Sequence, residues 1–425
     1  MMAEGGSGRG RSVCVSDGVD DGDGRASGGD GGSATAPLIA ARVGRIPPNP
    51  FAAADARVAA AIAGGLDVID LSKGNPDGEP PRFMVDAAVG ATRDPANFRY
   101  PAFDGKPAFL DAVAGWYERE HGVRLDPATQ ILAVSGASVG ISVTIEALID
   151  DGDLVVLVGP YYPQYEGSTA VAGGRIHVVP TDADHDFLPD LDAVPAAVWD
   201  EAKLLILNYP NNPTGAAATR ELFATAVRIA HRHHLVVVND FAYAGIGFDE
   251  TPPLSLLSVP GSEDVAVELC SLSKMYMVAG WRGGFVVGEP TVMKAIKTVH
   301  RQTSLLVTTT VQDAGAAGLN SDQSTVRVLA RRYKHRYETL RDGLSAAGLH
   351  LETARGGLFA WMRAPDGWSD TEFSDWLLHK AQVAVIPGSD FGPTGAGHVR
   401  LSLLVPSAVL AKASERIAAA RGEAW

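Results

Sequence analysis

The chain has 425 residues, of which 46% are hydrophobic and 20% are charged, and its formal net charge is −14. This length suggests two or three domains with ample apolar material for a core. The acidic balance argues against nucleic acid or an anionic membrane as a partner, because both call for a basic surface, and no uncharged apolar run reaches the ~18 residues of a membrane span.

The start of the chain differs in composition from the rest. Eleven of residues 1–35 are glycine and few are bulky and apolar, so this segment cannot bury enough surface to offset its ordering entropy. We therefore expect a disordered Gly/Asp/Ser-rich tail over residues 1–45. It lacks the apolar core of a signal peptide, and the two cysteines, Cys14 and Cys270, are too few for a disulfide framework. We expect a cytoplasmic protein.

Beyond the tail, short apolar runs alternate with segments of helical length such as Ser138–Leu148 and Thr219–His233. Strand–helix alternation of this kind predicts an α/β fold, in which a mainly parallel seven-stranded sheet is covered by helices on both faces. The seven predicted strands are Gln130–Val134, Leu154–Val158, Arg175–Val179, Lys203–Leu207, Leu235–Asn239, Val265–Leu269 and Gly284–Val287.

The C-terminal third has a different pattern, which predicts a smaller α+β domain. It opens with a long helical stretch from about Pro290 through Arg341. Strands near Leu358–Arg363, Val383–Ile386 and His398–Leu403 follow, and then a last helix, Pro406–Arg421. The N-terminal stretch Pro47–Leu71 is expected to complete this domain.

These patterns give a domain prediction for the whole chain. Residues 46–80 form an N-terminal arm and part of the small domain, residues 81–295 the large domain, and residues 296–425 the C-terminal small domain.

The strongest chemical signal is Ser271-Leu-Ser273-Lys274, followed eight residues later by Arg282. Lys274 follows an apolar strand and precedes an uncharged stretch, so it either has a buried partner or serves as an amine nucleophile. Two hydroxyls and an arginine nearby are suited to binding a phosphate. From these residues alone, a phosphate-plus-amine site and a structural ion pair both remain open.

Three weaker motifs are predicted at the same edge of the sheet. Asn208–Gly215 and the pair Asp240 and Tyr243 each follow a strand, and ligands bind at the carboxyl ends of parallel strands. The small-residue turn Ser135–Gly140, which contains Gly136, opens a helix whose free amides suit an anion. Each motif alone is common, and it is their convergence that indicates a site.

Taken together and in order, these motifs resemble the class I/II aminotransferases, which are pyridoxal 5′-phosphate (PLP) enzymes of the PLP-dependent transferase fold type I. The resemblance covers the chain from about Ile46 to its end, and Leu207–Gly215, Ser271–Lys274 and Arg99-Tyr-Pro are most similar to the LL-diaminopimelate and alanine aminotransferase-like branch.

The resemblance implies a role for each residue around the cofactor ring. Lys274 matches the lysine that holds PLP as an internal aldimine and then moves a proton. Asp240 matches the carboxylate that keeps the pyridine nitrogen protonated. Asn212 and Tyr243 match the donors to the ring's 3-oxygen, and Tyr162 matches the aromatic residue that stacks on the ring. The residues that match the phosphate-binding group are Gly136, Ala137, Ser138, Ser271, Ser273 and Arg282.

The resemblance also implies a substrate site and a partner. Arg400 matches the arginine that binds the substrate α-carboxylate through a bidentate pair of hydrogen bonds. Gly74 matches a glycine whose small size lets the chain close over the substrate. Tyr100 matches a tyrosine that reaches the partner subunit's phosphate, which implies an obligatory homodimer with shared active sites. Neighbouring Tyr161 and Tyr165 are expected to be packing residues.

Other residues are given no chemical role. His231, His233 and His234 read as the end of a solvated helix, not as a metal site, and Cys270 as a small core residue.

Two positions and one segment depart from the related diaminopimelate enzymes. The segment, Leu305–Val311, does not resemble the substrate-binding segment of those enzymes. Gly245 stands where those enzymes commonly carry glutamate, and Met277 replaces an asparagine. We take this as lost volume and polarity near the cofactor, and we expect a pocket for an amino acid other than diaminopimelate.

The leading interpretation is therefore transamination, in which an L-amino acid and a 2-oxo acid exchange the amino group. An alternative retains PLP but leads to elimination or replacement, to carbon–carbon bond formation, including with S-adenosylmethionine, or to oxidation. A third class, transcription regulators built on this fold, needs a DNA-binding module, and residues 1–45 are too short and glycine-rich for one.

Overall fold

The computed structural model describes residues 38–249 and 251–422, so the predicted tail up to residue 37, with Cys14, lies outside the described residues. The described residues from Ala41 onward form one compact unit, which opens with a short 3₁₀ helix, Ala41–Arg45. Because this unit is not divided further, the predicted boundaries at residues 80 and 295 stay predictions.

The largest sheet has seven strands in the order β2-β8-β7-β6-β5-β3-β4. Only β8 runs antiparallel to its neighbours β2 and β7, so the prediction of a mainly parallel sheet is confirmed. The strands are β2 (Ile131–Val134), β3 (Leu154–Val158), β4 (Arg175–Val179), β5 (Ala202–Leu207), β6 (Val236–Asp240), β7 (Ala266–Ser271) and β8 (Gly284–Gly288).

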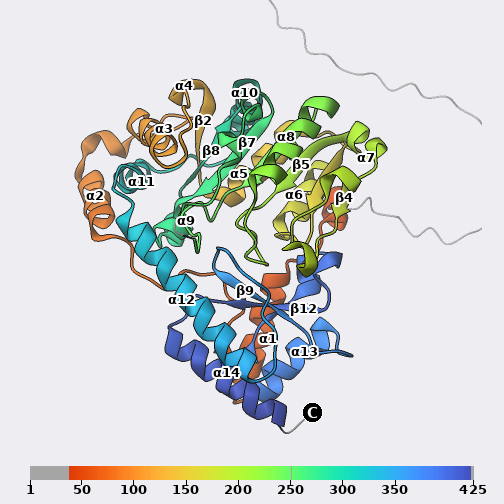
Figure 1. Ribbon diagram of the computed structural model, residues 1–425. Coiled ribbons are helices and arrows are strands. Elements are labelled where there is room, and N and C mark those ends of the chain that lie inside the picture. Colours follow the sequence, from red (N-terminus) through yellow and green to blue (C-terminus); the bar gives the residue numbers. More distant parts are fainter. Residues whose placement is uncertain (1–37, 250, 423–425) are drawn as a thin grey trace, which may run out of the picture. The chain divides into compact units, whose positions relative to one another are not determined.

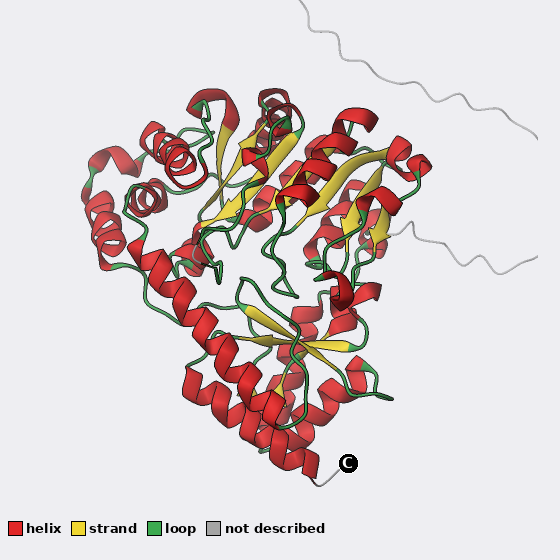
Figure 2. Cartoon of the chain, viewed as in Figure 1, coloured by secondary structure: helices red, strands yellow, loops and turns green. Residues whose placement is uncertain are grey.

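Helices cover both faces of this sheet (Figures 1 and 2). Along β5, Leu204 and Ile206 pack into one core, whereas Leu205 and Leu207 pack into the core on the other face, as the two-residue repeat of a strand requires. One face carries α5 (Ala137–Leu148), α6 (Gln164–Ala172) and α10 (Pro290–Thr303). The other carries α3 (Pro107–His121), α7 (Ala196–Glu201) and α8 (Arg220–His233). The short α4 (Pro127–Gln130) leads into β2, and α2 (Arg82–Arg93) packs against α11 (Thr309–Leu319).

A second group of elements surrounds a small sheet with the order β11-β12-β9. Its strands β9 (Phe359–Arg363), β11 (Ile386–Pro387) and β12 (His398–Ser402) are antiparallel. The N-terminal β1 (Ile69–Asp70) pairs in parallel with β10 (Val383–Ala384). The helices of this group are α1 (Pro50–Ala63), α12 (Ser324–Ala346), α13 (Asp370–Trp376) and α14 (Ser407–Gly422). The N-terminal segment is thereby brought next to the C-terminal strands.

The predicted helical stretch from Pro290 to Arg341 is helical over most of its length but is divided into three helices: α10, α11 and α12. The chain leaves helical geometry after Thr303, where Ser304 is extended. The chain leaves helical geometry a second time just before Ser324, because Gln323 has a left-handed φ of 58°. The Gln323 side chain donates to the carbonyls of Gly318 and Leu319, so it caps the end of α11.

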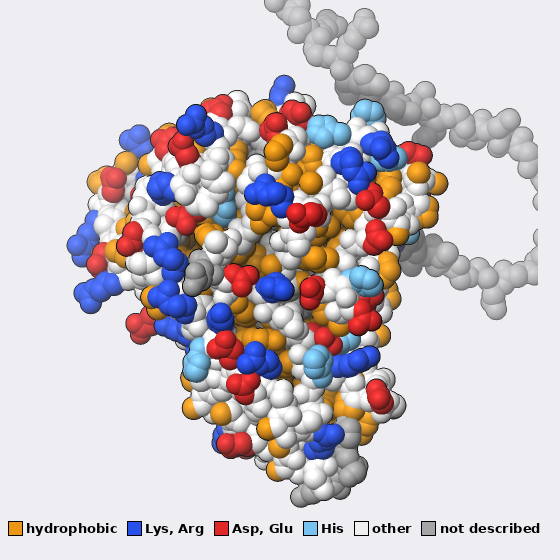
Figure 3. Space-filling view, in the orientation of Figure 1, with side chains coloured by type: hydrophobic (Ala, Val, Ile, Leu, Met, Phe, Trp, Pro, Cys, Tyr) orange, Lys and Arg blue, Asp and Glu red, His pale blue; other side chains and the backbone are white. Residues whose placement is uncertain are grey.

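None of the described helices is both long and apolar enough to cross a membrane. On the face shown in Figure 3, acidic and basic side chains are interspersed.

Candidate active site

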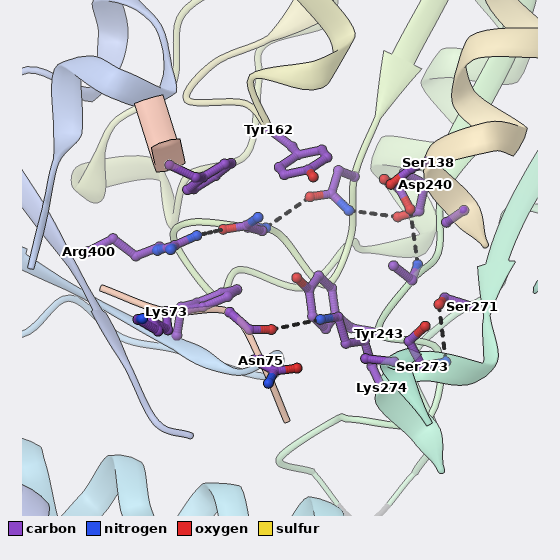
Figure 4. Close-up of a pocket in the computed structure, with 18 of the residues that line it drawn as sticks. Lys73, Asn75, Ser138, Tyr162, Asp240, Tyr243, Ser271, Ser273, Lys274 and Arg400 are labelled. Carbon is purple, nitrogen blue, oxygen red and sulfur yellow. Dashed lines mark hydrogen bonds between the residues drawn. The ribbon is translucent and has the colours of Figure 1, made fainter. Parts of the chain in front are cut away.

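A cavity of about 380 Å³ lies where the ends of β6 and β7 meet the start of α5, the strand β12 and the N-terminal segment. Figure 4 shows its principal side chains. Of the predicted site residues, all but Gly136 and Tyr100 line this cavity. Those that do are Gly74, Ala137, Ser138, Tyr162, Asn212, Asp240, Tyr243, Ser271, Ser273, Lys274, Arg282 and Arg400.

Lys274 lies in the single helical turn α9 (Leu272–Met275) that follows β7. Its Nζ donates to the Gly74 carbonyl at 2.9 Å, and it makes no ion pair with any described carboxylate. Burial, and then the positive charges of Arg400 and Arg282, lower the pKa of Lys274 to about 8. An amine with such a pKa is partly neutral near physiological pH and can act as a nucleophile.

Asp240 ends β6 and is 4% exposed. Its Oδ2 accepts a hydrogen bond from the Tyr165 hydroxyl at 2.7 Å, and its Oδ1 accepts one from the Ala242 amide at 3.2 Å. Burial raises the pKa of Asp240 to about 6, against the opposing effect of these hydrogen bonds. No described cation pairs with this carboxylate, so it is suited to a cationic group on a ligand.

Arg400 lies in β12, is 1% exposed and has no carboxylate partner among the described residues. Its Nη1 donates to the Asn212 side-chain oxygen at 3.2 Å and its Nη2 to the Ser72 carbonyl at 2.8 Å, whereas its Nε has no partner in the described chain. Burial lowers the pKa of Arg400 to about 10. A buried guanidinium with no counter-ion is expected to bind an anion, and its fork matches a carboxylate.

An anion site is built at the start of α5. Gly136, its N-cap residue, has a φ of 91°, and a Cβ at this position would lie 2.6 Å from Nη2 of Arg282. Glycine therefore lets the guanidinium of Arg282 approach the first amides of the helix, those of Ala137 and Ser138. Positive charge from the helix N-terminus and from arginine converges there, which suits a phosphate.

The loop Asn208–Gly215 connects the carboxylate to the arginine. The Asn208 side chain donates to the Asp240 carbonyl at 2.7 Å and accepts from the Asn212 amide at 2.9 Å. Because Asn212 in turn accepts from Arg400, the two charged residues belong to one hydrogen-bonded chain, which Figure 4 shows.

The buried carboxylate of Glu268 is linked to the loop Asn208–Gly215 through the side chain of Asn239. Glu268 of β7 is fully buried and accepts four hydrogen bonds, two of them from Ser255 at 2.6 Å and from Asn239 at 3.0 Å. Asn239 also accepts from the Tyr209 amide at 3.2 Å. Glu268 had no signal in the sequence beyond being a charge in an apolar strand.

Other contributors were missed because only their position in space reveals them. Tyr165 was expected only to pack, yet it binds Asp240; it lies three residues after Tyr162, on the same turn of the chain. Phe51 stacks on Tyr162 with ring centres 5.9 Å apart and lies 5.2 Å from the Arg400 guanidinium. Phe51 comes from the N-terminal helix α1, far away in sequence.

Two predicted residues contribute differently from what their motifs suggested. The Tyr100 side chain is 97% exposed and lines no part of the cavity within this chain. A Cβ on Gly74 would lie 3.5 Å from Phe359, an ordinary contact, so the visible contribution of Gly74 is its carbonyl, which binds Lys274.

The premise that Gly245 and Met277 remove volume and polarity near the cofactor is wrong, because neither residue lines this cavity, and the expectation of a substrate other than diaminopimelate stays a prediction. Gly245 borders a separate cavity beside α12, where a Cβ would lie 2.4 Å from Val326. Met277 packs against Tyr333, also of α12. These substitutions are therefore explained by packing against α12 and say nothing about substrate size.

The remaining candidates have structural roles. His231 and His233 lie in the last turn of α8, and His233 pairs with Asp200 at 2.7 Å. Cys270 is fully buried in the core. In the part of the chain that the structure describes, no group of three or more His, Cys, Asp or Glu side chains is placed to hold a metal.

Comparisons with known proteins agree with this geometry. The family model described as aminotransferase class I and II matches residues 66–417. An LL-diaminopimelate aminotransferase of Nitratidesulfovibrio vulgaris is 39% identical over 89% of this chain and 98% of its own length. The L-glutamine–4-(methylsulfanyl)-2-oxobutanoate aminotransferase of Bacillus subtilis is 38% identical over 88% of this chain and 94% of its own.

Solved structures with a similar fold include a further aminotransferase. Apo-BacF from Bacillus subtilis superposes with a TM-score of 0.86 at 32% identity, over 90% of this chain and 98% of its own. A double mutant of the Thermus thermophilus aspartate aminotransferase has a TM-score of 0.85 at 29% identity, over 90% of this chain and 99% of its own.

Proposed function

Because this chain belongs to the class I and II aminotransferase family, whose PLP-dependent members exchange an amino group between an L-amino acid and a 2-oxo acid, we propose that the cavity around Lys274 is its active site. The observation that carries this proposal is a set of charges with no ion-pair partner among the described residues: the Lys274 amine, the Asp240 carboxylate and the Arg400 guanidinium. They match the aldehyde and ring nitrogen of PLP and the carboxylate of an amino acid.

The fit to the cofactor extends to its phosphate. Glycine at residue 136 lets the guanidinium of Arg282 lie close to the start of α5, and the hydroxyls of Ser271 and Ser273 lie on the same side of the cavity (Figure 4). When bound, PLP supplies an electron sink that makes the substrate Cα–H bond acidic.

The residues of the chain then have distinct tasks. Lys274 would attach the cofactor through Nζ and, once released, would take the proton from the substrate Cα and deliver it to the cofactor carbon that carried the aldehyde, C4′. Asp240 would stay ionised and keep the ring nitrogen of the cofactor protonated. Arg400 binds the α-carboxylate and so fixes which face of Cα meets Lys274. Tyr162 would pack on the ring, and Asn212 and Tyr243 would donate hydrogen bonds to the ring oxygen.

The comparisons give the reaction class but not the amino acid, since the two named relatives act on different substrates. They give no support to the alternative outcomes of elimination, carbon–carbon bond formation or oxidation. A cytoplasmic location, which the low cysteine content favours, stays a proposal.

The pH dependence of cofactor attachment tests the role of Lys274. With a pKa of about 8 in the ligand-free chain, the neutral, nucleophilic fraction rises as the pH passes 8, whereas an ordinary lysine needs a pH of about 10.4. The rate at which excess pyridoxal, which lacks the titrating phosphate, attaches to apoenzyme should have its midpoint near pH 8. In Arg400→Met, which removes a nearby positive charge, the midpoint should rise. A midpoint above pH 10 in the unmodified chain would contradict this assignment.

We also propose that the chain works as a homodimer in which Tyr100 completes the partner's site. The segment from Asn97 to Asp104 is joined to the start of α11 by the Thr309 hydroxyl, which donates to the Asn97 carbonyl. Large apolar side chains on the two sides of this contact are exposed: Phe98 by 74%, Phe103 by 60% and Leu305 by 84%. Exposed apolar groups gathered in this way favour an interface.

Breaking this surface tests the dimer. Phe98→Asp with Leu305→Asp should convert the protein into monomers and reduce kcat/KM by roughly 100-fold, because two charges would be buried in the interface. Light scattering coupled to gel filtration measures the mass. Val328→Asp, at a 50% exposed apolar residue of α12, is the matched control and should stay dimeric. A double variant that is monomeric and fully active would contradict the shared site.

A further inference from the structure

Two polar side chains lie next to each other on neighbouring strands of the large sheet, outside the cavity. Asn239 of β6 and Glu268 of β7 are register partners, and both are fully buried. Because side chains alternate along a strand, Asn239 points to the face of the sheet opposite to that of its neighbour Asp240. Neither Asn239 nor Glu268 lines the cavity, so any effect on the site has to pass through other residues.

The orientation of the Asn239 amide group is fixed at both ends. Its Oδ1 accepts a hydrogen bond from the Tyr209 backbone amide at 3.2 Å, and its Nδ2 donates to Oε1 of Glu268 at 3.0 Å. A backbone amide can only donate, so the oxygen of Asn239 has to face Tyr209 and its nitrogen has to face Glu268. The Leu256 amide donates to the same Oε1 at 2.7 Å, so this oxygen of Glu268 acts only as an acceptor.

The Tyr209 amide lies at the start of the loop that carries Asn212. The side chain of the preceding residue, Asn208, accepts a hydrogen bond from the Asn212 amide at 2.9 Å. Asn239 therefore holds the main chain at the point from which the Asn208 side chain reaches Asn212. A continuous path of hydrogen bonds and main chain joins Glu268 to Asn212.

Asn212 is the end of this path that lies in the cavity. Its Oδ1 accepts from Nη1 of Arg400 at 3.2 Å. A guanidinium can only donate, so the Nδ2 group of Asn212 is turned away from Arg400. No described residue accepts a hydrogen bond from this Nδ2, which in the proposed active site would donate to the ring oxygen of PLP. The strength of that hydrogen bond depends on where the loop holds residue 212.

From these contacts we propose that Asn239, held by Glu268, is a positioning residue that fixes the place from which Asn212 reaches the ring oxygen of the cofactor. This inference rests on the proposed active site and adds to it two residues that touch neither cofactor nor substrate. A hydrogen bond from Asn212 stabilises the ionised ring oxygen and so lowers the pKa at which the bound cofactor takes up a proton. Displacing Asn212 should raise that pKa.

The test follows the visible absorbance of the PLP-loaded enzyme as the pH is varied, without substrate. Asn239→Leu keeps the size of the side chain but removes the acceptor of the Tyr209 amide. The pKa of the bound cofactor should rise by at least about 0.5 unit, as for partial loss of a hydrogen bond to a charged group. Asn239→Thr, a β-branched residue whose hydroxyl is one bond shorter, is a second variant with the same expectation.

Variants of the carboxylate show whether Glu268 acts through Asn239. Glu268→Gln keeps an oxygen that accepts from Asn239, and its new NH₂ group can donate to the rotatable hydroxyls of Ser255 and Tyr117, so the cofactor pKa should stay within about 0.2 unit. Glu268→Met removes the acceptor and should raise the pKa. In the double variant Glu268→Met with Asn239→Leu, the shift should equal that of Asn239→Leu alone, because the two residues belong to one path.

Tyr117→Phe is the matched control. It removes a different hydrogen bond to Glu268, the one from the Tyr117 hydroxyl to Oε2 at 3.0 Å, and leaves Oε1 free to hold Asn239. The melting temperature should fall, as for a lost buried hydrogen bond, while the cofactor pKa should not change. A pKa shift in Tyr117→Phe as large as that in Asn239→Leu would reveal a general loss of packing and overturn the inference.

The other failures are distinct from one another. An unchanged cofactor pKa in Asn239→Leu and Asn239→Thr would overturn the inference and leave the active site as proposed. Additive shifts in the double variant, or a shift in Glu268→Gln as large as in Glu268→Met, would overturn the role of Glu268. A Lys274→Ala variant whose bound PLP titrates in the same way as that of the unmodified enzyme would overturn the proposed function and the inference with it.

Discussion

Replacing Lys274 with alanine is expected to reduce kcat by at least about 10⁴-fold, the upper end of what a positioned acid–base group contributes. The physical reason is that one nitrogen has two tasks: Nζ attaches the cofactor and moves the proton at Cα. The change removes a side chain whose only hydrogen bond in the described chain is to the Gly74 carbonyl, so the fold should persist. Steady-state kinetics with saturating PLP measure the loss.

Two control variants distinguish the loss of the nucleophilic amine of Lys274 from the loss of a positive charge in the cavity. Lys274→Arg keeps a cation but not a nucleophilic amine and should be as inactive as Lys274→Ala. Lys73→Met removes the other lysine of the cavity and should keep covalent attachment of PLP. PLP should still bind to Lys274→Ala without a covalent bond, because the cup at α5 and Arg282 is intact. Substantial activity in Lys274→Arg would contradict the assignment.

Asp240→Asn is expected to reduce kcat/KM by roughly 10³-fold, the scale of losing one preorganised electrostatic group. Asparagine keeps the size of the side chain but removes the negative charge that would hold a proton on the ring nitrogen. Because burial already raises the pKa of Asp240 to about 6, the ligand-free carboxyl is neutral below that pH. Binding of pyridoxal, which lacks the titrating phosphate, by the unmodified chain should therefore weaken as the pH falls below 6, whereas Asp240→Asn should show no such step.

A change at Tyr165 tests the role of Asp240 with a smaller perturbation than Asp240→Asn. Its hydroxyl donates to Asp240 and lowers the pKa of that carboxyl, so Tyr165→Phe should move the acid limb of kcat/KM to higher pH. The activity at the optimum should fall only several-fold, as for one lost hydrogen bond to a charged group. An acid limb that stays in place would show that Tyr165 does not act through Asp240.

The large sheet could be predicted from the sequence because its strands are buried on both faces. Leu154–Val158 is apolar throughout and has the same bounds in the structure. The helices between Pro290 and Ala346 could not be separated, since the break at Gln323 depends on a left-handed backbone conformation at a residue with no turn preference. The capping of α11 by the Gln323 side chain is a tertiary outcome that no local pattern encodes.

The site was predictable to the extent that its residues follow strands in short motifs. Lys274, Asp240 and the residues of the Asn208–Gly215 loop converge as expected, although their roles came from the family resemblance and the residues alone left a structural ion pair open. Phe51 and Glu268 were missed, since neither lies in a motif. Gly245 was misplaced because two residues after Tyr243 the chain has already turned away from the cavity toward α12.

The most direct measurement is to reduce the PLP-loaded protein with borohydride, digest it and locate the cofactor by mass spectrometry. We expect a single adduct, on the peptide that contains Ser271-Leu-Ser273-Lys274, with the mass on Nζ of Lys274. An adduct on another lysine of the cavity, such as Lys73, or no adduct in a sample that has bound the cofactor, would contradict the central claim.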